Sequence, residues 1–254
     1  MKAGILLTVV VALGAVFWAT GNFKPPARHL LITDVSATPL GRRALAVTMT
    51  IENQGDPDQL LDVASPAAET RFQNATRGLP IPGGRSSLAL DAAHVVAVPS
   101  GAALEDGALL PLTLRFDAAG EVSVKARVII PEPNSMAAHM AMGHGAMTHE
   151  VKTGPAPALS LAVSQSDTGW IAKIETEHFA FSEDLQNGDH VPGTGHGHIY
   201  VGDMKLGRVF SDSFAIGALP KGTHSVRVTL NTNDHRAIVV DGKPVAAEAI
   251  IEVD

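Results

Sequence analysis

The chain contains a segment whose side chains are suited to binding a soft metal ion. Residues 136–149, MAAHMAMGHGAMTH, hold four methionines and three histidines in fourteen residues, with no formally charged side chain and two glycines. Thioether and imidazole are neutral ligands that suit copper(I), and imidazole also binds copper(II) and zinc. We interpret the segment as a metal-binding tract, and the alternative is a flexible linker that happens to carry Met and His. Its candidate ligands are Met136, His139, Met140, Met142, His144, Met147 and His149.

A second group of histidines lies in the C-terminal part of the chain. In the segment Gly195-His196-Gly197-His198, alternation along a strand would place both imidazoles on one face of a sheet. His224 and His235 follow at the start and the end of later strand patterns and are further candidate ligands. The alternative is structural, because an imidazole can bridge backbone groups through both of its nitrogens. An all-histidine site fits copper(II) or zinc, whereas the Met-rich tract favours copper, so copper is the predicted metal and zinc the second choice.

Composition restricts the class of protein. The 254 residues carry a formal net charge of −7, which argues against nucleic acid as a partner because no basic stripe is available for phosphates. The sequence contains no cysteine, so it offers no disulfide, no thiolate ligand and no lipid-bearing cysteine of the bacterial lipoprotein type. A soft-metal site in this chain must therefore be built from Met and His, which an oxidising compartment tolerates better than thiols.

The first 22 residues resemble a targeting segment. Lys2 is followed by an apolar run from Ala3 to Ala19, which is typical of a signal peptide or a signal anchor. The run is slightly short for a membrane span, but Trp18 would suit the membrane interface. We favour a hydrophobic helix kept as an anchor in the inner membrane, with cleavage as the alternative. Both interpretations place the remainder in the periplasm.

The elements that must position the histidines read as short strands. Leu45 to Glu52 alternates apolar and polar residues, as a half-buried strand does, and is followed by a turn at Asn53-Gln54-Gly55-Asp56. Repeated short strands without long amphipathic helices predict an all-β fold of two β-sandwiches, cupredoxin-like or immunoglobulin-like. We expect one sandwich over residues 28–130, a Met/His-rich linker over 131–157, and a His-rich sandwich over 158–254. The other strands expected are 60–64, 87–90, 95–98, 110–116, 122–129, 159–163, 170–175, 197–201, 224–230 and 246–253, with a hairpin turn at Asp241-Gly242.

The expected first sandwich resembles the periplasmic copper chaperone family called PCuAC. The resemblance rests on three segments in order: residues 49–56 (MTIENQGD), residues 81–84 (IPGG) and residues 110–122 (LPLTLRFDAAGEV). It implies a cupredoxin-like sandwich and a family site that holds copper(I) with two His and two Met. Here the first family histidine falls near Gln73, and the final His-x-Met reads His94-Val95-Val96. His94 is thus a candidate residual ligand, and the alternative is a structural histidine.

The C-terminal part is similar to small exported bacterial β-domains with a fixed order of histidine motifs. That order is G-H-x-H, then L-P-x-G-x-H, then N-D-H, and here it runs through residues 195–198, 219–224 and 233–235. Metal binding by this part is inferred from the residue types and not from the resemblance.

The motifs together predict a periplasmic copper-binding protein or copper chaperone. It would acquire copper and pass it, by exchange of Met and His ligands, to a periplasmic or membrane partner such as a cytochrome oxidase assembly factor. No Ser-His-Asp order, phosphate loop or paired carboxylates stand out, so we expect no enzyme. The alternative is a membrane-tethered structural or interaction subunit whose histidines are structural. Ordinary histidine titration predicts that metal affinity weakens near pH 6.

Overall fold

The structure is a computed structural model that describes residues 29–41, 43–75, 78–101, 105–132 and 147–254. Every regular element in these residues is a strand, which confirms the all-β prediction for this part of the chain. Within the same residues, no helix has the length and apolarity needed to cross a membrane. The expected N-terminal anchor and the tract residues Met136, His139, Met140, Met142 and His144 lie outside the described residues.

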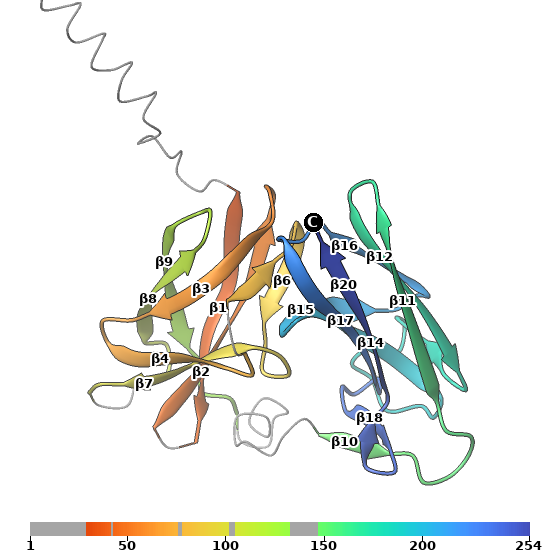
Figure 1. Cartoon of the computed structure of the whole chain (residues 1–254). Helices are drawn as coiled ribbons and strands as arrows, with labels where there is room; N and C mark the ends of the chain where they lie inside the picture. Colours follow the sequence, from red (N-terminus) through yellow and green to blue (C-terminus); the bar gives the residue numbers. More distant parts are fainter. Residues whose placement is uncertain (1–28, 42, 76–77, 102–104, 133–146) are drawn as a thin grey trace, which may run out of the picture.

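The strands fall into two groups that lie side by side in Figure 1. The N-terminal group is β1 (Leu30–Leu40), β2 (Ala44–Asn53), β3 (Asp58–Ala64), β4 (Ala68–Gln73), β5 (Leu79–Ile81), β6 (Gly84–Leu88), β7 (His94–Pro99), β8 (Leu109–Phe116) and β9 (Glu121–Val128). The C-terminal group is β10 (Thr148–Glu150), β11 (Ala158–Ser166), β12 (Gly169–Glu177), β13 (Ala180–Phe181), β14 (Thr194–Val201), β15 (Met204–Val209), β16 (Ser213–Gly217), β17 (Gly222–Asn231), β18 (Ala237–Val240), β19 (Lys243–Pro244) and β20 (Ala246–Val253).

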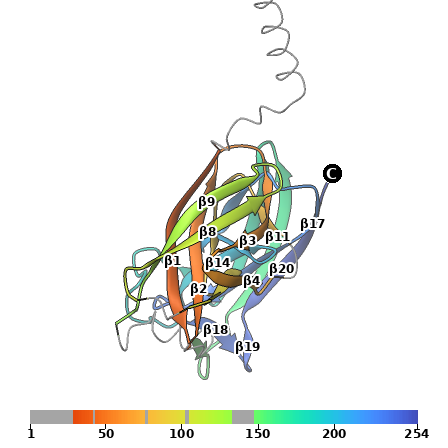
Figure 2. The ribbon, with the colours of Figure 1, turned by 90° about the vertical axis from the view of Figure 1, so that its left-hand side faces the viewer.

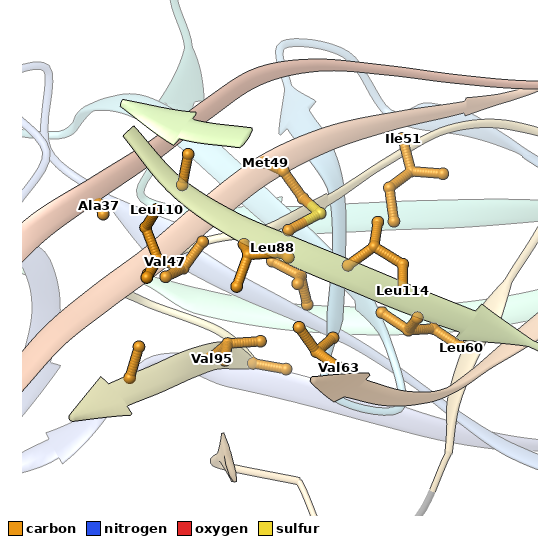
Figure 3. Close-up of a cluster of buried hydrophobic side chains, with 14 of the residues drawn as sticks. Ala37, Val47, Met49, Ile51, Leu60, Val63, Leu88, Val95, Leu110 and Leu114 are labelled. Atoms are coloured by element: carbon orange, nitrogen blue, oxygen red, sulfur yellow. The ribbon is translucent and has the colours of Figure 1, made fainter. Parts of the chain in front are cut away.

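The N-terminal group is organised around β2. This strand pairs antiparallel with β1 along its length and with β6 and β7 on its other edge. Its alternating pattern turns Val47, Met49 and Ile51 into a core built of aliphatic side chains, as Figure 3 shows. Leu60 of β3 and Leu114 of β8 close this core from the facing strands. The predicted turn after β2 is confirmed, because the Asn53 side chain accepts from the Gly55 amide at 3.0 Å.

The C-terminal group consists of two facing sheets. β14 lies between β15 and β17, and β17 continues to β20. A three-stranded sheet of β11, β12 and β16 covers one face of this sheet (Figure 1). The two sheets bury a shared core, in which Ile174 and Ile216 from one sheet meet Ile199 and Val228 from the other. The second face of β14 is therefore free to carry polar side chains.

The two groups contact each other through β6, β15 and the loops beside them. Lys205 of β15 pairs with Ser87 of β6. The amide of Ala93 donates to the carbonyl of Asp203 at 2.8 Å. Met204, at the start of β15, is fully buried within the core of the N-terminal group. In the side view of Figure 2, the N-terminal strands lie in front of the C-terminal strands.

The structure differs from the sequence prediction at two kinds of place. Several strands are missing from the prediction, among them β1, β4, β15 and β16, although each of these four pairs with a strand that is predicted. The segment expected to be linker contains β10, which joins β18 in parallel through His149↔Ile238. Such short strands form because their backbone pairs with a neighbouring strand, and they are too short to show an alternating pattern in the sequence. The hairpin turn at Asp241-Gly242 is confirmed, because both residues have the positive φ that this turn requires.

Candidate metal site

Three of the predicted ligands lie together. His196 and His198 come from β14, and His235 comes from the loop between β17 and β18. One ring nitrogen from each lies within 4.8 Å of the others, and among the described residues this is the cluster of His, Cys, Asp or Glu that could hold a metal ion. The ring centroids of His196 and His198 are 4.9 Å apart, and those of His196 and His235 are 4.8 Å apart. The site is therefore compact enough for one ion to contact all three imidazoles.

Strand alternation explains how β14 presents two of these rings. Ile199 and Val201 face the shared core of the C-terminal group. His196, His198 and Tyr200 occupy the alternate positions and so lie on the opposite face of the strand. Both histidines are nevertheless buried, at 0% and 5% exposure. One strand thus supplies an apolar face to the core and an imidazole face to the site.

The third ring is held by a tight loop. His235 has a φ of 67°, in the left-handed region that residues other than glycine seldom adopt. Its amide donates to the carbonyl of Thr232 at 3.0 Å, and the Asp234–Arg236 ion pair of 2.9 Å fastens the same loop. Such backbone conformations concentrate at functional sites. Here the loop turns His235 back toward β14.

Hydrogen bonds made by one ring nitrogen of His198 and of His235 determine which nitrogen of each ring is free to bind metal. His198 Nδ1 lies 2.9 Å from Asp91 Oδ2, and because a carboxylate oxygen can only accept, Nδ1–H donates the hydrogen bond. His235 Nε2 lies 2.7 Å from Asn187 Oδ1, a carbonyl oxygen that also accepts. These two bonds leave His198 Nε2 and His235 Nδ1 unprotonated in the neutral rings. They are the lone pairs that a metal ion requires.

His196 has hydrogen-bonding capacity that the protein leaves unused. Its Nε2 lies 3.1 Å from His198 Nε2. Its Nδ1 is buried and has no hydrogen-bond partner. Buried polar atoms are normally paired, and an exception calls for a bound group or a functional role. The unpaired nitrogen fits a site designed to receive a further ligand.

The three imidazoles are neutral at physiological pH. Burial, with further contributions from the neighbouring rings and cations, lowers the pKa of His196 to about 3. Burial and the charge of Arg208 lower the pKa of His235 to about 4. Burial also lowers the pKa of His198, although the hydrogen bond to Asp91 opposes it. Neutral imidazole is the form that binds metal, so no proton has to leave these rings when an ion arrives.

Two of the three rings border a cavity of about 630 Å³ between the two strand groups. His198 and His235 line it from the C-terminal group, and Asp91 lines it from the N-terminal group. Met147, the last methionine of the tract, lines the same cavity. The Met147 carbonyl accepts from the Ala237 amide at 2.8 Å, two residues after His235. The one described methionine of the tract thus borders the cavity that two of the three imidazoles line.

Sequence reasoning missed Asp91. The residue lies in the loop between β6 and β7, and its Oδ2 contacts His198, Lys205 Nζ at 2.6 Å and the Tyr200 hydroxyl at 3.2 Å. Burial by itself would raise the pKa of Asp91, but the hydrogen bond from His198 and the charge of Lys205 hold it well below its usual range. Asp91 precedes Tyr200 by 109 residues, and no local pattern links the two. The Asn187 contact to His235 was missed for the same reason.

The other described candidates lie apart from the triad. His224 Nε2 contacts the Pro220 carbonyl oxygen at 2.7 Å, so this ring fastens the loop before β17. His149 lies against His190, with ring centroids 4.1 Å apart. Both rings border a separate cavity of about 560 Å³. His224 and His149 therefore lie in two separate places outside the triad.

His94 lies in the N-terminal group. It is 5% exposed, and its Nδ1 contacts the Ala92 carbonyl oxygen at 3.1 Å. The residue paired with it across β4 and β7 is Gln73, near which the PCuAC resemblance led us to expect the first family histidine. His94 is absent from the metal-suited cluster found in the described residues. Its surroundings match a structural histidine.

Comparisons with known proteins cover mainly the N-terminal group. Residues 30–128 match a family model described as LpqE-like, a lipoprotein family. A copper-bound PCuAC domain from PmoF2 is 28% identical over 41% of this chain and 94% of that chain, with a TM-score of 0.37. An apo PCuAC domain from PmoF1 is 25% identical over 38% of this chain and 88% of that one, with a TM-score of 0.35. Fibronectin(III)-like modules of Clostridium thermocellum CbhA cover 88% of this chain and 94% of theirs at 8% identity, with a TM-score of 0.24.

These matches confirm the predicted PCuAC resemblance for the N-terminal group, about two fifths of the chain. The LpqE-like match ends at residue 128, before β10 and all the residues of the triad. No curated protein matches the chain. The histidine triad thus belongs to a part of the chain that the family match does not reach.

Proposed function

We propose that this protein is a periplasmic copper-binding protein that holds its cargo at His196, His198 and His235. The observation that carries the proposal is a cluster of three neutral imidazoles with one nitrogen each within 4.8 Å. Two of them are held by oxygen acceptors in the form that binds metal, and the third has a buried nitrogen without a partner. The PCuAC resemblance of residues 30–128 supports copper as the cargo.

The ligand set favours copper over zinc. Three imidazoles suit copper(II) and zinc about equally. Met147 lines the same cavity as His198 and His235, and thioether is a ligand of copper(I) but a poor one for zinc. A place with both ligand types can accept copper in either oxidation state. Zinc remains the second candidate for the three histidines alone.

We further propose that the Met/His tract delivers copper to the triad. Met147 is the last methionine of the tract, and its backbone is hydrogen-bonded to Ala237, two residues after His235 of the triad. The Met147 side chain is 39% exposed, so it is accessible from outside the cavity. Individual Met contacts can be exchanged one at a time, which allows an ion to pass along them and finally to a partner protein. An oxidase assembly factor or a copper pump would be such a partner.

The N-terminal group would serve as a scaffold and docking unit in this scheme. Its one family histidine, His94, is opposite Gln73 and is bonded to a backbone carbonyl. We propose two sandwich units, tethered to the inner membrane by residues 1–22, with no enzymatic activity. The competing proposal is a structural subunit, and the bond between His224 and Pro220 shows that a histidine of this chain can act in that way.

Copper stoichiometry of the full chain tests the proposal. Three proteins are compared: wild type, a variant with Met136, His139, Met140, Met142 and His144 changed to Ser, and His196→Leu combined with His235→Leu. We expect the tract variant to lose copper(I) but keep one tight copper(II), and the triad variant to lose that copper(II). His224→Gln is the matched control and should bind as wild type does. Wild-type protein that binds no tight copper would refute the copper proposal and favour the structural one.

A further inference from the structure

A carboxylate from the N-terminal group is the hydrogen-bond acceptor of a ring in the C-terminal group. Asp91 Oδ2 lies 2.9 Å from His198 Nδ1, and the side chains of Asp91 and His198 are 19% and 6% exposed. The contact is supported by backbone bonds on both sides of it. Ala93 donates to Asp203 at 2.8 Å, and Gly83 donates to Ala218 at 3.0 Å.

The acceptor decides which nitrogen of His198 carries the proton. With Nδ1 protonated and bonded to Asp91, the lone pair is on Nε2, which faces His196 Nε2 at 3.1 Å. Lys205 Nζ also lies 3.2 Å from His198 Nδ1, and an ammonium group can only donate. If Asp91 were absent, Lys205 would donate to Nδ1 and favour the proton on Nε2. The nitrogen that faces the triad would then have no lone pair for a metal.

We propose that Asp91 is a positioning residue that makes His198 a metal ligand, so that copper binding in the C-terminal group requires docking of the N-terminal group. This inference rests on the proposed copper site. It gives the N-terminal group a role at a site to which it contributes no ligand. A carboxylate bonded to a ligating histidine fixes the orientation and raises the basicity of the ring, and its loss costs about 10- to 100-fold in metal affinity.

The coupling must act in both directions. If docking strengthens copper binding, copper binding strengthens docking by the same factor. The amide of Ala93 is a direct reporter, because its hydrogen bond to Asp203 joins the two groups. We expect hydrogen exchange at this amide to slow when copper(II) is added. The same change should be absent once Asp91 is removed.

A purely structural role for Asp91 predicts a different pattern. Asp91 also pairs with Lys205 Nζ at 2.6 Å, so its loss leaves a buried ammonium without its carboxylate. If this ion pair were all that mattered, Lys205→Met would weaken copper binding as much as Asp91→Ala. If Asp91 acts through His198, Lys205→Met retains the affinity, because the Asp91–His198 bond remains. The double variant lacks both charges and so leaves no buried ammonium unpaired. It therefore still tests the role of Asp91 if Asp91→Ala folds poorly.

The experiment compares wild type, Asp91→Ala, Lys205→Met and the double variant as full chains. Copper(II) affinity is measured by competition with a chelator, and the ¹⁵N shifts of His198 are measured without metal. We expect Asp91→Ala to bind about 10- to 100-fold more weakly and to move the His198 proton to Nε2. Lys205→Met should bind within about threefold of wild type, and the double variant should recover part of the loss, because it also lacks the ammonium that would donate to His198 Nδ1.

Three results overturn the inference. The first is an unchanged affinity in Asp91→Ala, and the second is an equal loss in Lys205→Met. The third is a His198 proton that stays on Nδ1 when Asp91 is removed, which is measured without metal and so does not depend on copper binding. If wild type binds no copper at the triad, the proposed function fails and the coupling fails with it. If wild type binds copper and only the Asp91 effects are missing, the proposed function stands alone.

Discussion

Gln73 and His94 are direct partners in the antiparallel ladder of β4 and β7. Directly opposed residues of such a pair lie on the same face, with Cβ atoms about 4.5–5.5 Å apart. The two positions therefore have the relationship that two imidazoles need in order to share one ion. In this chain one of the two opposed positions is a histidine and the other is a glutamine.

Gln73→His should therefore create a second, weaker metal site. The new imidazole would face His94, whose Nδ1 is bonded to Ala92, and the chain would bind one additional copper(I). Copper(I) stoichiometry, measured in a His196→Leu background to remove the triad, gives the answer. Gln73→Asn is the control that alters the position without adding an imidazole. An unchanged stoichiometry would show that the opposed positions are too far apart or too tightly packed to bind.

His196→Leu should separate copper binding from stability. The wild-type ring is fully buried and its Nδ1 has no partner, a state that costs about 1–3 kcal/mol. Leucine is similar in volume and has no polar atom, so we expect the free energy of unfolding of the metal-free protein to rise by about 1 kcal/mol. Urea denaturation measures it, with and without copper(II). Copper(II) should raise the free energy of unfolding of wild type but not that of the variant. A destabilised metal-free variant would mean that losing the 3.1 Å bond between His196 Nε2 and His198 Nε2 costs more than removing the unpaired Nδ1 gains.

The copper(II) affinity of the triad should stay nearly constant between pH 7.5 and 5. Burial lowers the pKa of His196 to about 3 and that of His235 to about 4, so both rings are already neutral across this range. The expectation from ordinary histidine, a loss near pH 6, does not apply to rings in this environment. Affinity should fall steeply only below about pH 4, where protons compete for the rings. A tenfold fall between pH 7 and 6, measured by chelator competition, would contradict this prediction.

The same pKa shifts predict how the stability of the metal-free protein depends on pH. In the unfolded chain these histidines titrate near 6.5, whereas in the folded chain burial holds the pKa of His196 near 3. Between these two pH values the unfolded state binds more protons than the folded state. The contribution of the neutral ring to the free energy of unfolding is therefore fully present above about pH 6.5 and decreases as the pH falls below it. Each such histidine contributes a slope of roughly 1.4 kcal/mol per pH unit. Urea denaturation at pH 7, 6 and 5 measures it, and His196→Leu should show a smaller slope.

Alternation along one strand made part of the site predictable. His196 and His198 are two residues apart in a strand, so their shared face follows from the sequence alone. By residue type, His235 and His224 are equally good candidate ligands. Only the folded structure shows which of the two lies in the cluster. His235 lies beside His196, whereas His224 bonds to the Pro220 carbonyl. Asp91 was beyond prediction, because its contact with His198 depends on how two strand groups meet.

A substitution at Gly217 tests whether the contact between the two strand groups is needed for copper binding. A Cβ added to Gly217 would lie 1.9 Å from the Gly83 carbonyl oxygen, so Gly217→Ala must force the two chain segments apart. If Asp91 reaches His198 only in the docked arrangement, this change should weaken copper(II) binding although it alters neither residue. We expect a loss of about tenfold, the lower end of the range for removing a carboxylate that is hydrogen-bonded to a metal-binding histidine.

Gly207→Ala is the matched control, because a Cβ there would meet Phe214 at an ordinary 3.6 Å. It adds the same methyl group to the same strand group without disturbing the docked contact. Hydrogen exchange at Ala93 should speed up in Gly217→Ala and not in Gly207→Ala, since the Ala93 amide bonds across the boundary to Asp203. Faster exchange with an unchanged copper affinity would show that the triad works without the N-terminal group. A parallel change in both quantities would show that docking and metal binding are a single equilibrium.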